Sequence, residues 1–544
     1  MEYESFFQRH KILRGTLIVL LVLIIGLGGW LWTRMRGPHP NYRVDLMLPT
    51  AESMEAPGRL KVGVAKRSIA PIFDNYDTWT DVNGNTKYDE GVDTYVDRDG
   101  NGRFDGIWIA GFGTNRPAQG MHDEPNVRAL ALRNNGVTVV IVSLDSVGIF
   151  YNDFIDMRKM VNSTMDIDHI LFSSTHCHET PDTMKIWSYW KRIRGADIPV
   201  FGYAEHYMDL IKERTKEAVE EAVVGLQDCD LHTAKVEIMP EGFVDDSRKP
   251  IVIDNSMYLM RFTKPFTDET IATFVNWGNH PETLGGSNPL ITSDFPHWIR
   301  EGLEKGVPAP NGVEGFGGMC IYVQGMVGGL MTQLHTTVPH RDGKQKFEEA
   351  SWEKVESLGY NLAIVAATAL RDEELAWKTE KPIVQLAAET FPLPIGGAYK
   401  YAMMLGIIHP GYKWGGYSWS EMNVLRVGET LMLTVPGEIY PEIVEGGVEY
   451  KAGNDFGLQA PVEAPRLRDF MEEKAKMGLV VGLANDQIGY IVPKSQWDDQ
   501  APFVYDGAQY GEENSPGPET APTIHRQAVK LLKTMNENWI EPEE

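Results

Sequence analysis

The sequence predicts a mixed α/β (α+β) protein, with one large domain of mixed β-sheets flanked by helices and a single N-terminal transmembrane helix. The composition is that of a globular protein, with 42% hydrophobic and 10% aromatic residues in a chain of 544. Short apolar runs of strand length alternate with longer amphipathic stretches of helical period. One uncharged stretch near the N-terminus is long enough to cross a bilayer. Together these observations favour a membrane-anchored body with a large core.

The uncharged stretch covers residues 15–33 and lies between Arg14 and Arg34. As a helix it spans about 28 Å, close to the thickness of a hydrocarbon core. It ends in Trp30-Leu31-Trp32, as expected at a membrane interface, and it lacks a small-residue cleavage site. We interpret it as an uncleaved signal anchor that leaves residues 1–14 in the cytoplasm. A cleaved signal peptide is the alternative.

The folded body is expected to span residues 60–544, because residues 34–59 show no periodicity and are typical of a linker. Strands are predicted at residues 62–65, 137–144, 169–172, 256–262 and 273–277. Amphipathic helices are predicted at 203–224 and 351–374. No second linker divides the body, so a single large domain is the simplest organisation.

Two short runs between residues 81 and 105 carry oxygen side chains at alternate positions. They contribute Asp81, Asn83, Asn85 and Asp89, then Asp97, Asp99, Asn101 and Asp105. Ca²⁺ binds several such oxygens from a tightly curled loop. The runs are not EF-hands, because Val92 and Trp108 stand where a bidentate glutamate is required. Calcium loops and solvated Asx turns without an ion are the two interpretations. Calcium is plentiful outside the cytoplasm, so the runs favour a periplasmic or extracellular body on a single-pass anchor.

The net charge of −25 argues against a nucleic-acid partner, because a phosphate-binding surface needs a basic patch. The cysteines Cys177, Cys229 and Cys320 form no metal-spaced pair. We interpret Cys177 as a buried structural thiol.

Histidines and a carboxylate recur at the ends of predicted strands. His176 and His178 follow the apolar run at 170–172, and residues two apart on a strand face the same side. His280 ends the strand at 273–277, and Glu438 follows another apolar run through a Pro-Gly turn. Such a set suits a metal centre, since histidine is the commonest metal ligand. Each residue alone could equally be a structural turn residue.

The motifs that contain these residues occur in an order and spacing that resemble the neutral/alkaline ceramidase family. They are Val62-Gly63-Val64-Ala65-Lys66, Gly120-Met121-His122-Asp123, Ser174-Thr175-His176-Cys177-His178, Trp277-Gly278-Asn279-His280-Pro281 and Val435-Pro436-Gly437-Glu438. The resemblance runs from about Leu60 to the region of Ile524. It implies a zinc site with His176, His280, Glu438 and Tyr490 as ligands. Two histidines and a carboxylate with an open position form a catalytic zinc pattern on chemical grounds as well.

The resemblance also implies that His178, Arg248 and Tyr510 are catalytic. His178 would take or relay a proton, and Arg248 or Tyr510 would stabilise the oxyanion. His122 and Asp145 are expected to support the site from behind. The implied reaction is hydrolysis of an amide by metal-activated water, in an N-acyl sphingosine or another N-acyl lipid. Zinc is the implied cofactor, with calcium as a second candidate.

The sequence departs from the family in three places. Glu179 and Asp182 replace part of a glycine-rich stretch that follows the second histidine, and are expected to add carboxylates to the pocket. Gly328 stands where the family has a serine, and no C-terminal immunoglobulin-like domain is expected. A zinc hydrolase acting on a different ester or amide therefore stays open. A zinc phosphoesterase and a non-catalytic, calcium-stabilised binding module are further alternatives.

Overall fold

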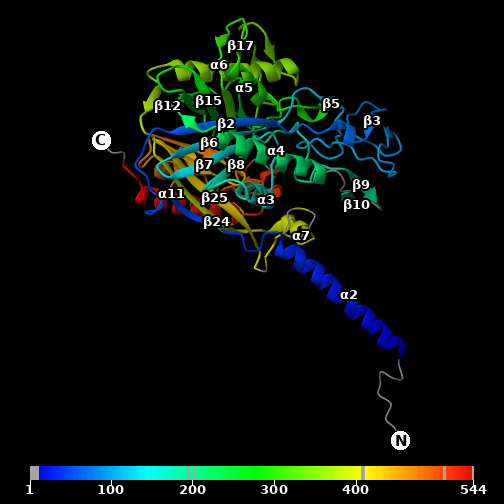
Figure 1. Cartoon of the computed structure of the whole chain (residues 1–544). Coiled ribbons are helices and arrows are strands. Elements are labelled where there is room, and N and C mark those ends of the chain that lie inside the picture. Colours follow the sequence, from blue (N-terminus) through cyan, green and yellow to red (C-terminus); the bar gives the residue numbers. More distant parts are fainter. Residues whose placement is uncertain are drawn as a thin grey trace.

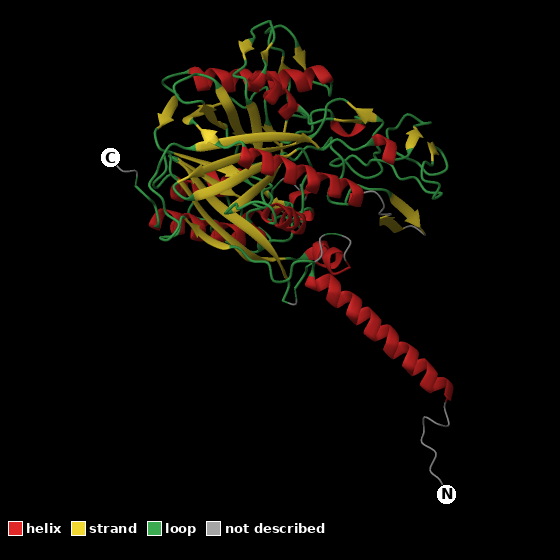
Figure 2. Cartoon of the chain, viewed as in Figure 1, coloured by secondary structure: helices red, strands yellow, loops and turns green. Residues whose placement is uncertain are grey.

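The computed structural model describes residues 11–193, 196–199, 204–405, 408, 411–413, 415–505 and 510–541. Most of the predicted cytoplasmic segment 1–14 lies outside the described residues. The body contains three five-stranded sheets, and each sheet includes one parallel strand pair. This arrangement confirms the predicted mixed α/β class (Figures 1 and 2).

The first sheet contains the predicted strands at 62–65, 137–144 and 169–172. Its order is β11 (Gln227–Asp228), β2 (Lys61–Ser68), β6 (Asn126–Asn134), β7 (Val137–Leu144) and β8 (His169–Ser174). Strands β7 and β8 are its parallel pair. One face is covered by α3 (Tyr151–Asn162) and α4 (Ala204–Val224), whose apolar sides pack with the sheet in one buried cluster. Helix α4 confirms the helix predicted at 203–224.

The second sheet contains the predicted strands at 256–262 and 273–277. Its order is β19 (Met319–Gln324), β15 (Thr270–Trp277), β14 (Ser256–Thr263), β12 (Asp230–Glu237) and β23 (Ala376–Thr379). Strands β15 and β19 are parallel. Helices α5 (Phe295–Glu304) and α6 (Trp352–Arg371) cover its outer face. Ser351 caps α6 by accepting a hydrogen bond from the Lys354 amide, which explains why that helix starts there.

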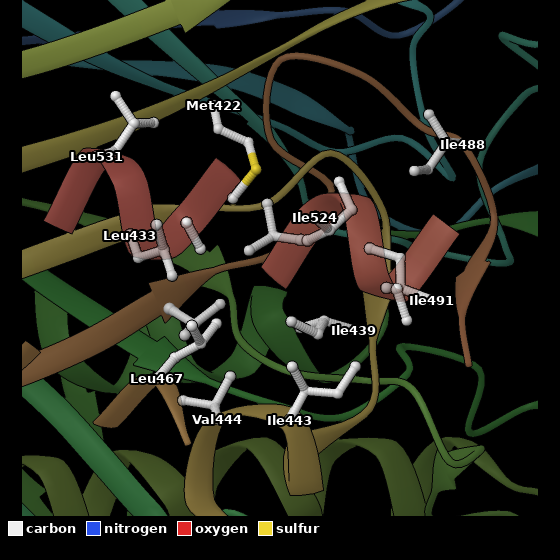
Figure 3. Close-up of a cluster of buried hydrophobic side chains, with 14 of the residues drawn as sticks. Met422, Leu433, Ile439, Ile443, Val444, Leu467, Ile488, Ile491, Ile524 and Leu531 are labelled. Atoms are coloured by element: carbon white, nitrogen blue, oxygen red, sulfur yellow. The ribbon is translucent and has the colours of Figure 1, made fainter. Parts of the chain in front are cut away.

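The strands of the third sheet were not among those predicted from the sequence. Its order is β1 (Asp45–Leu48), β24 (Val384–Pro394), β25 (Tyr417–Val427), β26 (Thr430–Thr434) and β28 (Met477–Val481). Strands β26 and β28 are parallel. Figure 3 shows the core between this sheet and α11 (Thr520–Glu537), where Met422 and Leu433 of the sheet lie near Ile524 and Leu531 of the helix.

The inner faces of the three sheets share one further core. Val62 of the first sheet, Phe274 of the second and Leu425 of the third belong to the same buried cluster. Each sheet is thus apolar on both faces, toward the shared core and toward its own helices. This explains why its strands read as continuous apolar runs rather than as alternating patterns.

Shorter elements occupy the connections. They are β3 (Thr78–Thr80), β4 (Thr94–Val96), β5 (Gly120–Met121), β9 (Trp190–Ile193), β10 (Ala196–Pro199), β13 (Asp245–Asp246), β16 (Leu290–Ile291), β17 (Gly306–Val307), β18 (Val313–Glu314), β20 (Met331–Thr332), β21 (Val338–Pro339), β22 (Lys346–Phe347), β27 (Glu438–Ile439), β29 (Tyr490–Ile491), α7 (Gly397–Leu405), α8 (Pro441–Glu445), α9 (Leu467–Met471), α10 (Tyr510–Glu513) and the 3₁₀ turns η1 (Phe73–Asn75), η2 (Gly285–Ser287) and η3 (Lys494–Gln496).

Helix α2 (Lys11–Arg36) projects from the body (Figure 1). Within Gly15–Arg36, an 18-residue window has a mean hydropathy of 2.3 and is not buried by the rest of the protein. It is therefore long and apolar enough to cross a membrane, as the sequence predicts, and it continues about one turn beyond residue 33.

The prediction that residues 34–59 form a linker is wrong for much of this segment. Met35 belongs to a buried core cluster, and β1 pairs with β24 as the edge strand of the third sheet. Val44 and Leu48 are buried as well. Strand β1 has only four residues, and its partner lies more than 300 residues away, so the local sequence shows no period that would reveal it.

Candidate metal centre

The predicted ligands come from all three sheets. His176 follows β8 of the first sheet, His280 follows β15 of the second, and Glu438 follows β26 of the third. Tyr490 lies in the segment after β28. Each of these strands belongs to a parallel pair, and the ends of parallel strands are a frequent place for ligand sites.

Buried polar contacts hold these loops together. Gln324, at the end of β19, donates through Nε2 to the carbonyls of Thr175 (2.8 Å) and Asn279 (2.7 Å), the residues that precede His176 and His280. Strands β27 and β29 are parallel, and their register places Glu438 beside Tyr490. The short β27–β29 ladder thus brings two residues 52 positions apart into one site.

Four predicted ligands converge on one point. Glu438 Oε2 lies 3.4 Å from His176 Nε2 and 3.3 Å from His280 Nε2. The Tyr490 hydroxyl lies 3.5 Å from His280 Nε2. His178 joins them, with its Nε2 at 3.4 Å from His176 Nε2. Ring nitrogens of the three histidines lie within 4.8 Å of one another, a group that could hold a metal ion.

The remaining atoms of these side chains are oriented by the protein. Nδ1 of His176 lies 2.6 Å from the Val147 carbonyl, and Nδ1 of His280 lies 2.6 Å from the Met331 carbonyl. Each Nδ1 therefore carries the proton, which leaves both Nε2 lone pairs directed at the shared point. Backbone partners of this kind are typical of metal-binding histidines.

Glu438 completes the donor set. Its Oε1 accepts from Gln487 Nε2 at 2.9 Å, whereas its buried Oε2 has no hydrogen-bond partner among the described residues. Burial opposes ionisation, yet His176 and His280 hold the pKa of the Glu438 carboxyl well below its usual value. Two imidazole nitrogens, a carboxylate oxygen and a phenol directed at one point fit zinc.

The backbone brings His176 and His178 together differently from the prediction. Strand β8 ends at Ser174, and His176 has a left-handed φ of 64°, which is uncommon for a residue other than glycine. The two rings meet because the chain turns, not because both residues lie on one strand. Residues held in such conformations often mark functional sites.

Glu282 is a site residue that the sequence reading missed. Its Oε2 lies 3.1 Å from His178 Nδ1, and its Oε1 accepts from the Thr332 hydroxyl at 2.5 Å. Burial lowers the pKa of His178 to about 4, with His176 and His280 adding to the effect and Glu282 opposing it. His178 is thus a neutral, carboxylate-oriented imidazole. A signal was present, since Glu282 stands two residues after His280, as His178 does after His176.

A cavity of about 110 Å³ leads to this group of side chains. Its polar wall includes His176, His178, Glu438, Tyr490 and Tyr510. Its apolar wall comes from several separate segments, with Phe150, Met184, Ile186, Trp187, Tyr399 and Ile408. Polar groups at the end of an apolar cavity are typical of a site for an amphiphilic small molecule.

Tyr510 and Arg248 take different positions. The Tyr510 ring lies 5.8 Å from the Tyr490 ring at the cavity, and burial raises the pKa of its hydroxyl to about 12. Arg248 is not among the residues that line the cavity. Its guanidinium donates to Glu512 (2.5 Å) and to the Gln496 carbonyl (3.0 Å). The catalytic assignment of Arg248 is therefore corrected to a supporting one, because Glu512 belongs to α10, the short helix that carries Tyr510.

Comparison with solved structures shows what this arrangement resembles. The crystal structure of a neutral ceramidase from Pseudomonas aeruginosa and a ceramidase described as complexed with C2 each superpose with a TM-score of 0.59. Each alignment covers 89% of this chain and 76% of the other, at 14% sequence identity. The chain has the neutral ceramidase fold. No protein-family model and no curated protein matches the sequence.

The packing of the neutral ceramidase fold explains why position 328 is a glycine. A Cβ at this position would lie 2.4 Å from the Tyr440 amide nitrogen, and the Gly328 amide donates to the Ile439 carbonyl at 2.9 Å. The backbone that follows Glu438 therefore occupies the space that a serine would need. The glycine allows this segment to pack directly behind the site.

The expectation that Glu179 and Asp182 add carboxylates to the pocket is wrong, since neither lines the cavity. Glu179 is buried between Arg116 (3.2 Å) and Asn288 (3.0 Å). Asp182 accepts from the backbone amides of Met184 and Trp187. The carboxylates instead support the loop that forms the apolar wall.

The residues predicted to support the site have other partners. Asp145 pairs with Arg300 at 2.8 Å, and the His122 ring stacks on Trp352 at 3.9 Å. Cys177 is fully buried with a free thiol, as predicted.

The two Asp/Asn runs form a paired unit around the antiparallel strands β3 and β4. Asp81 accepts from the amides of its own loop, and Asp97 does the same in the second loop. A carboxylate outside each loop also accepts hydrogen bonds from the amides of that loop or of the residue next to it. Asp93 accepts from the Val82 and Asp89 amides, and Asp77 accepts from the Arg98 and Asp105 amides. Such Asx-turn bonds form with or without an ion, so calcium binding stays a prediction.

Proposed function

We propose that this protein is a membrane-anchored, zinc-dependent amidohydrolase that cleaves N-acyl lipids, with N-acyl sphingosine as the first candidate. The observation that carries the proposal is that Glu438 Oε2 lies 3.4 Å from His176 Nε2 and 3.3 Å from His280 Nε2. The neutral ceramidase fold supports the same reaction class, because the solved structure that shares it is named a neutral ceramidase, and a ceramidase hydrolyses an amide.

His176, His280, Glu438 and Tyr490 would hold the zinc ion. When bound, zinc acidifies water and polarises a carbonyl oxygen. The neutral His178 can accept a proton at Nε2 while Glu282 fixes its Nδ1. The Tyr510 hydroxyl, protonated at neutral pH, can donate to the carbonyl oxygen as negative charge develops there. Water adds to the amide carbon, the C–N bond breaks, and the transferred proton leaves with the amine.

The apolar wall of the cavity favours an acyl chain as the group beside the scissile bond. An anchor at the N-terminus keeps the body beside membrane lipid. We propose that residues after the anchor lie outside the cytoplasm, in the periplasm or the extracellular space.

The decisive experiment measures zinc content and hydrolysis together on the full chain. We expect about one zinc per chain, and turnover of fluorescent N-acyl sphingosine that a zinc chelator abolishes. A panel of carboxylic esters and phosphate esters tests the other reaction classes. Zinc-free protein without amide turnover would leave the non-catalytic interpretation, whereas turnover of phosphate esters alone would overturn the amidase proposal.

For the paired loops at 81–105 we propose calcium as a stabilising ion. Support comes from their alternating oxygen side chains. An ion there would stabilise a unit that contacts the segment of the cavity wall, because Tyr88 of the first loop packs on Tyr189 (5.7 Å), two residues after the wall residue Trp187. Calcium should raise the thermal midpoint of the full chain, and Asp81→Ala together with Asp97→Ala should remove that rise. An unchanged midpoint with calcium would favour ion-free Asx turns.

A further inference from the structure

The membrane helix ends on the body itself rather than on a flexible tether. Met35, in its last turn, is only 4% exposed and belongs to a buried core cluster. The Gly411 amide donates to the Arg34 carbonyl at 3.0 Å, and Lys413 Nζ donates to the Arg36 carbonyl at 2.8 Å. These bonds use carbonyls that a free helix end would leave to water. The orientation of the body relative to α2 is thereby restricted.

The element beside this junction is α7, which contacts α2 (Figure 1). Two residues of α7 and the segment after it, Tyr399 and Ile408, line the cavity of the candidate metal centre. Its Tyr401 is 63% exposed and presents an aromatic ring to solvent. One short helix therefore touches the membrane helix, the cavity and solvent.

The position of the bilayer follows from α2. Trp30 and Trp32 are suited to the membrane interface, and Arg34 and Arg36 lie over their rings at 5.8 and 5.2 Å. Met35 is three residues beyond Trp32, about 5 Å along a helix. Because Met35 is already inside the body, the adjacent α7 has to lie at the depth of the lipid headgroups. Tyrosine and lysine, which α7 carries as Lys400 and Tyr401, are typical of that depth.

We propose that α7 rests on the leaflet in which α2 ends, and that the cavity opens toward this leaflet so that its substrate enters from the bilayer. The contact with the leaflet does not depend on the chemistry of the site. The entry of substrate rests on the proposed function, because it requires that the substrate is a membrane lipid.

The contact is tested on the full chain reconstituted in phosphatidylcholine vesicles. A Tyr401→Cys variant is labelled with an NBD fluorophore, since the native cysteines of the described residues are buried. The matched control is Glu314→Cys, an exposed site on β18, which pairs with β17 far from α2 (Figure 1). We expect a blue-shifted emission at position 401 that nitroxide-labelled lipid quenches, and neither effect at position 314. A water-like, unquenched label at 401 would overturn the proposal, whatever the enzymatic activity.

Substrate entry is tested with Tyr401→Glu, which places a charge on α7 outside the cavity wall. We expect a several-fold loss of turnover for an N-acyl lipid embedded in the vesicles. Turnover of a water-soluble short-chain N-acyl amide should be unchanged. Equal effects on the two substrates, whether no change or the same loss of turnover, would refute entry from the leaflet.

Discussion

Replacing Glu282 by glutamine tests whether this carboxylate orients the proton-handling histidine. The substitution keeps the shape of the side chain and an oxygen that can still accept from His178 Nδ1, but it removes the negative charge. A hydrogen bond to a charged group contributes about 1.5–3 kcal/mol, against about 1 kcal/mol for a neutral one. The difference of about 1–2 kcal/mol corresponds to roughly a tenfold loss of kcat. Glu282→Ala also removes the acceptor, and we expect a loss of up to about 100-fold.

The assay separates this role from metal binding. Both variants should retain about one zinc per chain and a nearly native KM, because His176, His280 and Glu438 are unchanged. Thr332→Val is the matched control, since it removes the hydroxyl that holds the other oxygen of Glu282 and should cost less. Loss of zinc from Glu282→Gln would show that Glu282 is a ligand. A native kcat with native zinc would refute the orienting role.

Three further predictions address the rest of the site and the fold. His280→Ala should lose both zinc and amide hydrolysis while keeping the circular dichroism of the native chain, and retention of zinc would exclude His280 as a ligand. Gly328→Ser should destabilise the protein by about 1–3 kcal/mol in denaturant unfolding, because its Cβ would lie 2.4 Å from the Tyr440 amide nitrogen. Glu421→Gln should cost about 3–5 kcal/mol at neutral pH, since it breaks a buried pair with Arg158. Burial raises the pKa of the Glu421 carboxyl, but the opposing effect of Arg158 is larger and holds this pKa below 4.5. The stabilisation is therefore present above pH 4.5 and is lost as the pH falls through the pKa that Glu421 has in the folded protein. The difference between native and Glu421→Gln stability should therefore shrink in acid, and a constant difference would contradict this account.

The strands and the candidate ligands could be predicted from sequence for related physical reasons. Strands buried on both faces are continuous apolar runs, and a polar residue directly after such a run lies at the end of the strand. His280 and Glu438 were identifiable in this way. Glu282 was missed because its importance depends on His178, which lies more than 100 residues away. Arg248 was misassigned because spacing alone cannot distinguish a guanidinium at the cavity from one that pairs with Glu512 behind it.

The architecture suggests why the site requires the complete body. Each sheet supplies one candidate ligand after a strand of its parallel pair, so no single sheet can form the candidate metal centre alone. The shared core sets the distances between the sheets, and Gln324 joins two of the loops directly. Arg158 lies behind the site and bonds to both Glu421 of the third sheet and Asn485, in the loop that leads to Tyr490. A change in the packing between the sheets should therefore displace the candidate ligands and reduce activity before it unfolds the protein. Such a site functions only when its ligands are held within about 0.5 Å of the productive geometry.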